Sequence, residues 1–188
     1  MSNNELQEQK EKIRKQYISI RNNVENKLEK SIKIKNKIIN SEMYINSKVI
    51  ALYKNLPSEV STIELIEYSI RIGKMVVLPR VKEDNLEFYK IDNMKDKFIK
   101  SKFGVEEPVL NYSNLVHKEQ IDLIIVPGVC FDKNKNRMGF GKGFYDRFLA
   151  NSNLKSIGIC FEEQIINDLV VSDNDVKMQY IITDQKVY

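Results

Sequence analysis

The sequence is poor in the residues that build disulfide frameworks and zinc sites. Its 188 residues include two cysteines, one histidine and no tryptophan. Two cysteines cannot form a disulfide framework, and a single histidine without a cysteine cluster argues against a zinc site. Because Cys130 and Cys160 lie in apolar, strand-like runs, we expect both to be buried reduced thiols of a cytoplasmic protein.

Long hydrophobic runs are absent as well. No run approaches the roughly 20 apolar residues that a membrane-spanning helix needs, and the opening MSNNELQEQKEKIRK lacks the apolar segment of a secretory signal. With 42% hydrophobic residues the chain still has enough apolar side chains to bury a full core. No linker, repeat or low-complexity tract divides it, so we expect one domain over residues 1–188.

Positive charge is concentrated near the N-terminus. Residues 1–40 contain ten Lys or Arg and five Asp or Glu, a net +5, whereas the remaining 148 residues contain 20 and 21, a net −1. A solvated, lysine-rich helix explains this charge. A nucleic-acid-binding arm is a second interpretation, although no aromatic residues alternate with the basic ones. A third is that some of these cations meet a polyphosphate held elsewhere in the chain.

The N-terminal segment has the periodicity of an α-helix, followed by a second helical stretch over residues 34–43. The apolar positions of the first helix are Leu6, Ile13, Tyr17, Ile20, Val24 and Leu28. Lys10 and Arg14 are four residues apart and lie beside this apolar stripe, at the edge of the core where a ligand can lie. We expect these basic N-terminal helices, residues 1–45, to pack on a sheet.

Strands and helices alternate along the rest of the chain. Apolar runs predict strands over residues 48–53, 75–79, 86–91, 121–128, 155–161 and 180–183. Ser61 and Glu64 have the spacing of a capping box that starts a helix, which Gly73 ends. Residues 92–120 have a mixed pattern, with a loop over residues 103–108.

This alternation predicts an α/β fold, a three-layer α/β/α arrangement around a mainly parallel sheet. Ligands of such sheets bind beyond the carboxyl ends of the strands. Residues 127–146 follow the most apolar strand, Glu59 follows the first strand, and Arg80 follows the second. We therefore expect the ligand site among these residues.

Three glycines at alternate positions, Gly139, Gly141 and Gly143, are the most informative local pattern. They let the backbone turn sharply so that its N–H groups converge on an anion, and Lys142, Arg137 and the start of a following helix add positive potential. The spacing is neither a Walker A loop nor a dinucleotide-binding fingerprint. A tight strand-to-helix connection without a ligand also explains these glycines.

The longer string VPGVCFDKNKNRMGFGKGFYDRF is far more specific and resembles the signature of the 5-formyltetrahydrofolate cyclo-ligase family. Further resemblances, in the family's order, cover nearly the whole chain. They comprise Lys10 with Arg14, Glu59 with Ser61 and Thr62, Leu78-Pro79-Arg80, FEEQII (161–166) and Asn174-Asp175-Val176. The departures are Phe103 where Trp is frequent, Met138 for Leu, Phe140 for a residue often Arg, Phe144 for Tyr, and Val170-Val171 for Leu-Pro.

The resemblance implies that ATP and 5-formyltetrahydrofolate are converted to 5,10-methenyltetrahydrofolate, ADP and phosphate, with Mg²⁺. For ATP it implies contacts from Lys10, Arg14, Arg137, Met138, Gly139, Phe140, Gly141, Lys142, Gly143, Phe144 and Tyr145. For the folate it implies contacts from Glu59, Phe140, Gly141, Lys142, Gly143 and Phe144. Lys142, Arg137 and Tyr145 are the expected catalytic residues, and Asp146 and Asp175 the expected Mg²⁺ ligands.

Rival interpretations stay open at this point. They are another enzyme of the same architecture, such as a sugar-phosphate isomerase or a CoA-transferase-like protein, an RNA-binding module, and a folate-independent paralogue. The expected partner is the small-molecule substrate, bound by a monomer without nucleic acid or membrane.

We expect His117 to be a surface residue and Asp132 to cap a turn rather than bind metal.

Overall fold

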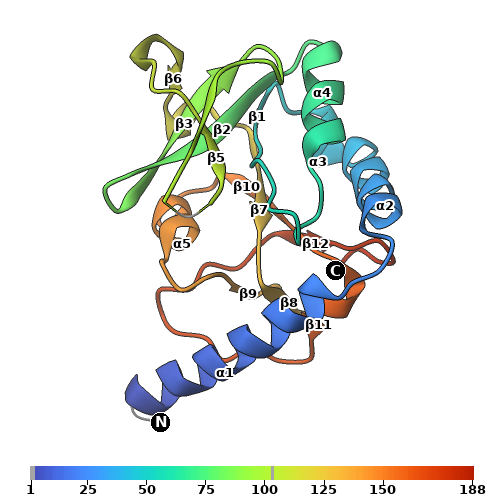
Figure 1. The fold of residues 1–188 in the computed structure, drawn as a ribbon, viewed down its shortest axis with the longest axis vertical. Coiled ribbons are helices and arrows are strands. Elements are labelled where there is room, and N and C mark those ends of the chain that lie inside the picture. The colour runs from blue at the N-terminus through green and yellow to red at the C-terminus, as the bar shows by residue number, and fades with distance from the viewer. Residues whose placement is uncertain (1–2, 103) are drawn as a thin grey trace.

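A seven-stranded central sheet forms the middle of the molecule (Figure 1) in the computed structural model, which describes residues 3–102 and 104–188. Its strand order is β12-β10-β7-β1-β2-β3-β6. The strands are β1 (Val49–Ala51), β2 (Met75–Lys82), β3 (Asn85–Ile91), β6 (Leu115–Val116), β7 (Leu123–Pro127), β10 (Lys155–Ile159) and β12 (Tyr180–Ile182). The strands from β12 to β2 are parallel, and β3 and β6 are antiparallel to their neighbours. The mainly parallel sheet is confirmed.

Helices cover both faces of this sheet. One face carries α2 (Lys27–Ile39), α3 (Glu42–Ile45) and α4 (Ile63–Arg71), and the opposite face carries the short helix α5 (Phe144–Leu149) together with loop segments (Figure 1). Residues 123–126 of β7 have no exposed surface, because side chains pack on both sides of that strand. The predicted three-layer α/β/α fold is therefore confirmed, with a thin second helical layer.

The first helix, α1 (Asn3–Asn22), corrects the expectation that residues 1–45 pack on the central sheet. It crosses the carboxyl end of that sheet (Figure 1) and packs Ile13, Tyr17 and Ile20 on a small three-stranded sheet. That sheet contains β8 (Cys130–Asp132), β9 (Arg137–Met138) and β11 (Ile165–Ile166). The charged face of α1 is thereby placed across the strand ends, where the ligand site was predicted.

Helix α1 ends earlier than its apolar periodicity predicts. The chain turns at residues 23–26, where Asn26 adopts a left-handed conformation with φ 53°. Leu28 consequently belongs to α2 and is 65% exposed instead of extending the apolar stripe of α1.

The capping box predicted before α4 is absent from the described part of the chain. The residue before the helix is Thr62, whose hydroxyl donates to the Tyr53 carbonyl instead of capping the helix. Glu64 pairs with Lys35 across to α2, at 2.8 Å between Nζ and Oε2. A tertiary contact has thus replaced the local one that the spacing suggested, whereas Gly73, with φ 81°, ends the helix as expected.

The mixed segment over residues 92–120 contains more structure than its sequence indicated. Strands β4 (Phe98–Lys100) and β5 (Glu106–Pro108) form an antiparallel hairpin, and η1 (Tyr112–Asn114) and η2 (Lys118–Gln120) are single 3-10 turns. The loop predicted over residues 103–108 is therefore a strand over its last half. Phe103, noted above as a departure from the family pattern, lies outside the described residues.

The polar turn between β8 and β9 is organised by one buried carboxylate. Asp132 has no exposed surface and accepts hydrogen bonds from the Asn136 backbone N–H at 2.9 Å, the Asn136 side chain at 2.8 Å and the Leu169 N–H at 2.9 Å. These bonds satisfy its buried charge. Asp132 thus holds the turn, as predicted, and returns the chain to the strand ends at Arg137.

The remaining sequence expectations concern single residues. Cys130 and Cys160 are free and buried, and burial raises the pKa of the Cys130 thiol to about 12, so that it stays a thiol near neutral pH. His117 is exposed. Over the described residues, no helix is both long and apolar enough to cross a membrane.

Substitution of Gly158 by alanine should destabilise the protein. A Cβ atom at this position would lie 2.4 Å from Cε1 of Phe131, whose ring is fully buried, and 3.1 Å from Cγ of Met178. Because close-packed rings cannot withdraw without moving their neighbours, we expect a loss of about 1–3 kcal/mol. Urea unfolding of the Gly158→Ala variant and of the wild type measures this loss. Equal stability of the two proteins would show that the Phe131 ring can move aside.

Candidate active site at the carboxyl ends of the strands

A cavity of about 620 Å³ opens where the carboxyl ends of β1 and β7 meet. Its walls come from α1, the segment after β1, the β2–β3 hairpin, the β4–β5 hairpin, residues 137–147 and the C-terminal loop over residues 170–175. The position agrees with the rule for parallel sheets. Arg80 was expected here, but β2 continues beyond it and its side chain donates to the Pro108 carbonyl at 2.8 Å instead of lining the described cavity.

The glycine loop, residues 139–143, forms one wall of the cavity and is closely covered by arginine side chains. A Cβ at Gly139 would lie 2.6 Å from an Arg137 nitrogen, and a Cβ at Gly141, where φ is 87°, would lie 3.1 Å from an Arg14 nitrogen. A side chain at Gly139 would displace the Arg137 guanidinium, and the positive φ at Gly141 favours glycine there. The loop brings two guanidinium groups against its backbone.

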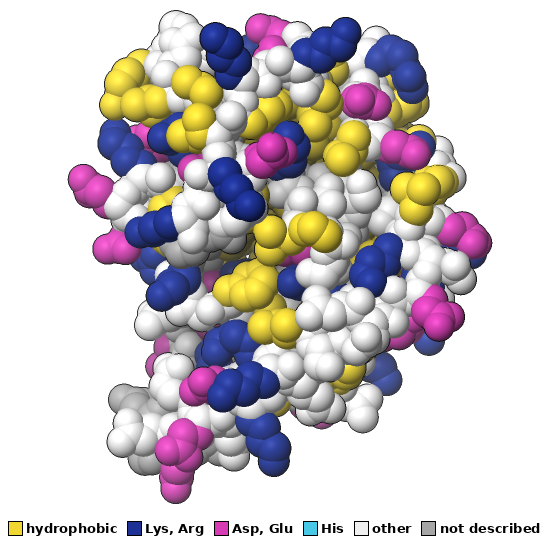
Figure 2. All heavy atoms as spheres, in the orientation of Figure 1, with side chains coloured by type: hydrophobic (Ala, Val, Ile, Leu, Met, Phe, Trp, Pro, Cys, Tyr) yellow, Lys and Arg dark blue, Asp and Glu magenta, His cyan; other side chains and the backbone are white. Residues whose placement is uncertain are grey.

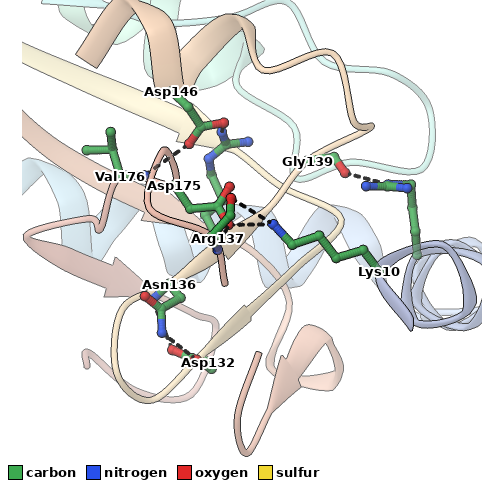
Figure 3. Close-up of polar contacts among 10 residues, drawn as sticks. Lys10, Asp132, Asn136, Arg137, Gly139, Asp146, Asp175 and Val176 are labelled. Atoms are coloured by element: carbon green, nitrogen blue, oxygen red, sulfur yellow. Dashed lines mark hydrogen bonds and ion pairs between the residues drawn. The ribbon is translucent and has the colours of Figure 1, made fainter. Parts of the chain in front are cut away.

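Two of the predicted cations reach the cavity wall from α1, Arg14 at the glycine loop and Lys10 at the C-terminal loop (Figure 3). Arg14 donates from Nε to the Gly139 carbonyl at 2.9 Å, and Lys10 donates to Asp175 at 2.5 Å and to the Ser172 hydroxyl at 3.3 Å. Their four-residue spacing on α1 places both on the helix side that faces the cavity. Lys10 and Arg14 therefore lie together at the cavity, as their spacing in the sequence predicted.

The Lys10 contact sets the charge of Asp175. Burial opposes ionisation, but the hydrogen bond from Lys10 and a 2.7 Å bond from the Ser172 N–H outweigh it and hold the pKa of Asp175 below its ordinary value. The carboxylate is therefore charged at neutral pH, and one of its oxygens accepts both bonds.

Replacement of Lys10 by methionine should cost stability only where Asp175 is ionised. A depressed pKa in the folded state contributes stability above the unfolded value, about 3.9, and that contribution is lost as pH falls through the folded pKa. We expect a difference in the free energy of unfolding of about 1 kcal/mol at pH 7 that vanishes below about pH 4. Urea unfolding across this pH range measures the difference. Lys15→Met is the control, because it removes only the exposed i,i+4 pair of Lys15 with Glu11. A difference that does not change with pH would contradict this assignment.

Arg137 and Asp146 form a second ion pair inside the cavity (Figure 3). Arg137 Nη2 lies 2.7 Å from Asp146 Oδ2, and the side chains are only 5% and 18% exposed. The other Asp146 oxygen accepts the Val176 N–H at 3.3 Å, which places this carboxylate beside Asp175. The Nε atom of Arg137 is buried without a hydrogen-bond partner among the described residues. A buried, partly unsatisfied guanidinium is suited to an anionic ligand.

The remaining loop residues differ in how they meet the cavity. Lys142 is exposed and makes no hydrogen bond or ion pair within the described ranges, so its ammonium is available to a ligand. Phe140 is 49% exposed beside it. Phe144 and Tyr145 line the cavity but also pack on the core beneath α5. Met138 is buried against Tyr17, so any ligand contact there comes mainly from its backbone.

Tyr145 is a neutral hydroxyl under all ordinary conditions. Burial, reinforced by the nearby charge of Glu59, raises its pKa well above the ordinary value of a tyrosine, although Arg137 opposes the shift. At neutral pH it can therefore donate or accept a hydrogen bond but cannot act as a base.

Glu59 lies deep in the cavity, paired with a residue that the sequence analysis did not single out. Its Oε1 is 3.3 Å from Arg21 Nη1 and its Oε2 accepts the Leu56 N–H at 2.9 Å. Burial raises the pKa of Glu59, while the Leu56 N–H and Arg21 oppose that shift. A signal for Arg21 was present, since at about 100° per residue Arg21 falls within about 20° of Arg14 around the helix axis.

The sequence analysis also missed two charged residues at the cavity, Lys54 and Glu107. Lys54 follows β1, lies 3.8 Å from the centre of the Phe98 ring and pairs with Glu106 at 2.5 Å. Glu107 is 7% exposed, lines the same cavity, and has a pKa raised by burial. Glu107 belongs to the β4–β5 wall, part of which the sequence predicted as a loop, and Lys54 contacts that wall through Phe98 and Glu106.

The carboxylates present are compatible with Mg²⁺ bound together with a phosphate ligand. In the described part of the chain, no cluster of three or more His, Cys, Asp or Glu side chains is arranged to hold a metal ion unaided. Asp146 and Asp175 are hard oxygen donors beside each other on the cavity wall. Mg²⁺ is characteristically held by one or two carboxylates plus phosphate oxygens, so this donor set fits it.

Comparison with known proteins agrees with the geometry. A sequence model described as the 5-formyltetrahydrofolate cyclo-ligase family matches residues 6–184. A Haemophilus influenzae protein named 5-formyltetrahydrofolate cyclo-ligase is 34% identical over 137 residues, which are 70% of this chain and 73% of that protein.

Two solved structures share the fold. An Aquifex aeolicus 5,10-methenyltetrahydrofolate synthetase is similar with a TM-score of 0.82 and 28% identity, over 95% of this chain and 91% of that one. A Mycoplasma pneumoniae 5,10-methenyltetrahydrofolate synthetase is similar with a TM-score of 0.74 and 27% identity, over 93% and 98% of the two chains. Because the family model matches almost the whole chain and the solved structures share its fold, the chain belongs to the 5-formyltetrahydrofolate cyclo-ligase family.

Proposed function

We propose that this protein catalyses the ATP-dependent cyclisation of 5-formyltetrahydrofolate to 5,10-methenyltetrahydrofolate, with release of ADP and phosphate. The observation that supports this most directly is the convergence of four cations on the cavity that the glycine loop lines. Lys10 and Arg14 from α1, Arg137 from β9 and Lys142 of the loop itself line the cavity that also contains the buried Glu59. One end of the cavity thus suits a polyphosphate, and the other suits a neutral ring system with hydrogen-bond donors.

The reaction needs a phosphoryl group because the formyl oxygen is a poor leaving group. Transfer of the γ-phosphoryl of ATP forms an O–P bond to that oxygen and releases ADP. N10 then attacks the formyl carbon and loses its proton, and the C–O bond breaks to release phosphate and leave the methenyl bridge. Phosphoryl transfer depends chiefly on alignment and charge neutralisation, which the cavity's cations can supply.

For ATP, we propose that the four cations neutralise the triphosphate while the backbone N–H groups of the glycine loop surround it. The positive end of α5 begins directly after the loop and adds to this field, although the helix is short. Lys142 is the best-placed mobile cation for the transferred group, because Lys10, Arg14 and Arg137 already contact protein oxygens. In this proposal Arg137 and Lys142 stabilise the charge that develops during transfer.

For the folate, we propose that Glu59 accepts hydrogen bonds from the pterin, whose adjacent N–H groups match a carboxylate. Phe140 and Phe144 line the cavity where they would flank the folate rings, and Tyr145 is a neutral hydrogen-bond donor near Glu59. Mg²⁺, when bound with ATP to Asp146 or Asp175, would supply further neutralisation of phosphate charge.

We also propose that the protein acts as a monomer in the cytoplasm without nucleic acid. The buried thiols suit a reducing compartment. On the face shown in Figure 2, Lys and Arg side chains alternate with Asp and Glu instead of forming one basic stripe. Several N-terminal cations are paired with carboxylates, as in Lys30 with Glu163.

Incubation of the purified protein with 5-formyltetrahydrofolate, ATP and Mg²⁺ tests this function. We expect the absorbance band of the methenyl product to grow only when all three are present, with one ADP formed per product. ATP binding without product would favour a folate-independent paralogue. Salt-dependent RNA binding without ATP turnover would favour the nucleic-acid-binding interpretation.

A further inference from the structure

Arg21, on the last turn of α1, is a fully buried cation that links three walls of the cavity. It is 2% exposed, and its Nη1 atom lies 3.3 Å from Glu59 Oε1 and 3.3 Å from the Gly128 carbonyl oxygen at the end of β7. Its guanidinium carbon lies 5.1 Å from the centre of the Phe140 ring in the glycine loop. Its Nε atom is buried with no hydrogen-bond partner among the described residues.

Stability alone does not account for this arrangement. A buried ion pair loses its hydration, and well-packed apolar residues of similar volume often stabilise a protein as well or better. The 3.3 Å contacts are long for charge-assisted hydrogen bonds, and one nitrogen is unsatisfied, so the pair is not optimised for the resting fold. What the pair does is fix the charge and position of Glu59.

Two groups counteract the burial of Glu59, the backbone N–H of Leu56 and the guanidinium of Arg21. The Leu56 N–H donates to Glu59, and Tyr53 and Tyr145 lie near enough to interact with it electrostatically. Burial raises the pKa of both tyrosines, so neither is charged near neutral pH. Arg21 is therefore the cation that opposes the effect of burial on Glu59.

We propose that Arg21 is a positioning residue that keeps Glu59 ionised and oriented to accept hydrogen bonds from the pterin of the folate. The inference rests on the proposed function, because it needs Glu59 to be a folate contact. Protonation of Glu59 would turn one of its two acceptor oxygens into a donor where the pterin also presents donors, so the carboxylate form binds more tightly. The Phe140 ring faces the guanidinium from the loop side in a cation–π contact.

The KM for 5-formyltetrahydrofolate, measured from about pH 6 to about pH 8.5, tests this role. For Arg21→Gln we expect KM to rise about tenfold or more at about pH 6 and to fall towards the wild-type value as pH rises. Arg21→Lys keeps a cation and should retain the flat wild-type profile. The KM for ATP should change less than about twofold in both variants, and Arg71→Gln, an exposed arginine on α4, should behave as wild type.

A KM raised by the same factor at every pH, or an unchanged KM, would overturn the proposal, since a purely structural arginine gives no pH profile. If Arg21→Gln does not fold, the proposal is tested on the wild-type protein. The pH at which the Glu59 carboxyl group is half ionised is then measured by ¹³C NMR. A midpoint below about pH 6.5 supports the proposal, and a higher midpoint overturns it. If the wild type makes no methenyl product, the proposed function itself fails; if it does, a flat Arg21→Gln profile removes this inference alone.

Discussion

Replacing Lys142 with alanine should lower kcat/KM for methenyl formation by at least about 100-fold. The ammonium is exposed at the cavity and has no protein partner in the described ranges, so the change removes a ligand contact and little else. The free energy of unfolding should change by less than about 0.5 kcal/mol, as for other exposed side chains. Initial rates at saturating Mg²⁺, together with urea unfolding, measure both quantities.

Lys133→Ala is the matched control for this experiment. Lys133 is also exposed and lies nearby in sequence, in the β8–β9 turn, but it does not line the cavity. We expect its variant to retain wild-type kinetics. Unchanged turnover in Lys142→Ala would remove this lysine from the mechanism, and equal losses in both variants would point to a general charge effect.

Replacing Asp146 with asparagine should reduce kcat about 100-fold or more and raise the Mg²⁺ concentration needed for half-maximal rate. In the wild type, Asp146 Oδ2 accepts a hydrogen bond from Arg137 Nη2 at 2.7 Å, and the amide oxygen of asparagine can still accept it. The negative charge available to a metal, however, is removed. Because Arg137 is left as an uncompensated buried cation, the protein should also lose about 1–3 kcal/mol of stability.

Mg²⁺ titrations of the rate separate these two effects. Asp168→Asn serves as control, because Asp168 is exposed and hydrogen-bonds only a neighbouring asparagine side chain, Asn134, among the described residues. Its kinetics and Mg²⁺ requirement should match the wild type. A wild-type Mg²⁺ requirement in Asp146→Asn would transfer the metal-binding role to Asp175.

The parts of the fold that the sequence predicted are those governed by burial on both faces. Strand β7 is a continuous apolar run, and β10 is buried from Ser156 to Ile159, because helices or loops cover both sides of the sheet. Their sequences alone therefore predict these two strands. Strands β8 and β9 were not predicted, because they span only three and two residues and pair through a turn held by Asp132. That turn depends on donors such as the Leu169 N–H, 37 residues away, which no local pattern reveals.

The site divides in the same way. Lys10 and Arg14 were found because the family resemblance and their helical spacing agree. The structure places Arg14 on the glycine loop and Lys10 on Asp175 of the same cavity. Arg21 continues the same helix face, but spacing cannot distinguish a buried cation from a solvated one. Its partner Glu59 is 38 residues distant, and only the crossing of α1 over the strand ends brings the two together.

Transfer of an isotope tests the central claim most directly. The formyl oxygen of 5-formyltetrahydrofolate can be labelled with ¹⁸O and the substrate converted by the wild-type protein with ATP and Mg²⁺. If the cations of the glycine loop and α1 direct the γ-phosphoryl group onto that oxygen, the phosphate released will carry the label. Methenyl product accompanied by unlabelled phosphate would contradict the account, because it would mean that ATP is hydrolysed by water and the formyl oxygen leaves by another route.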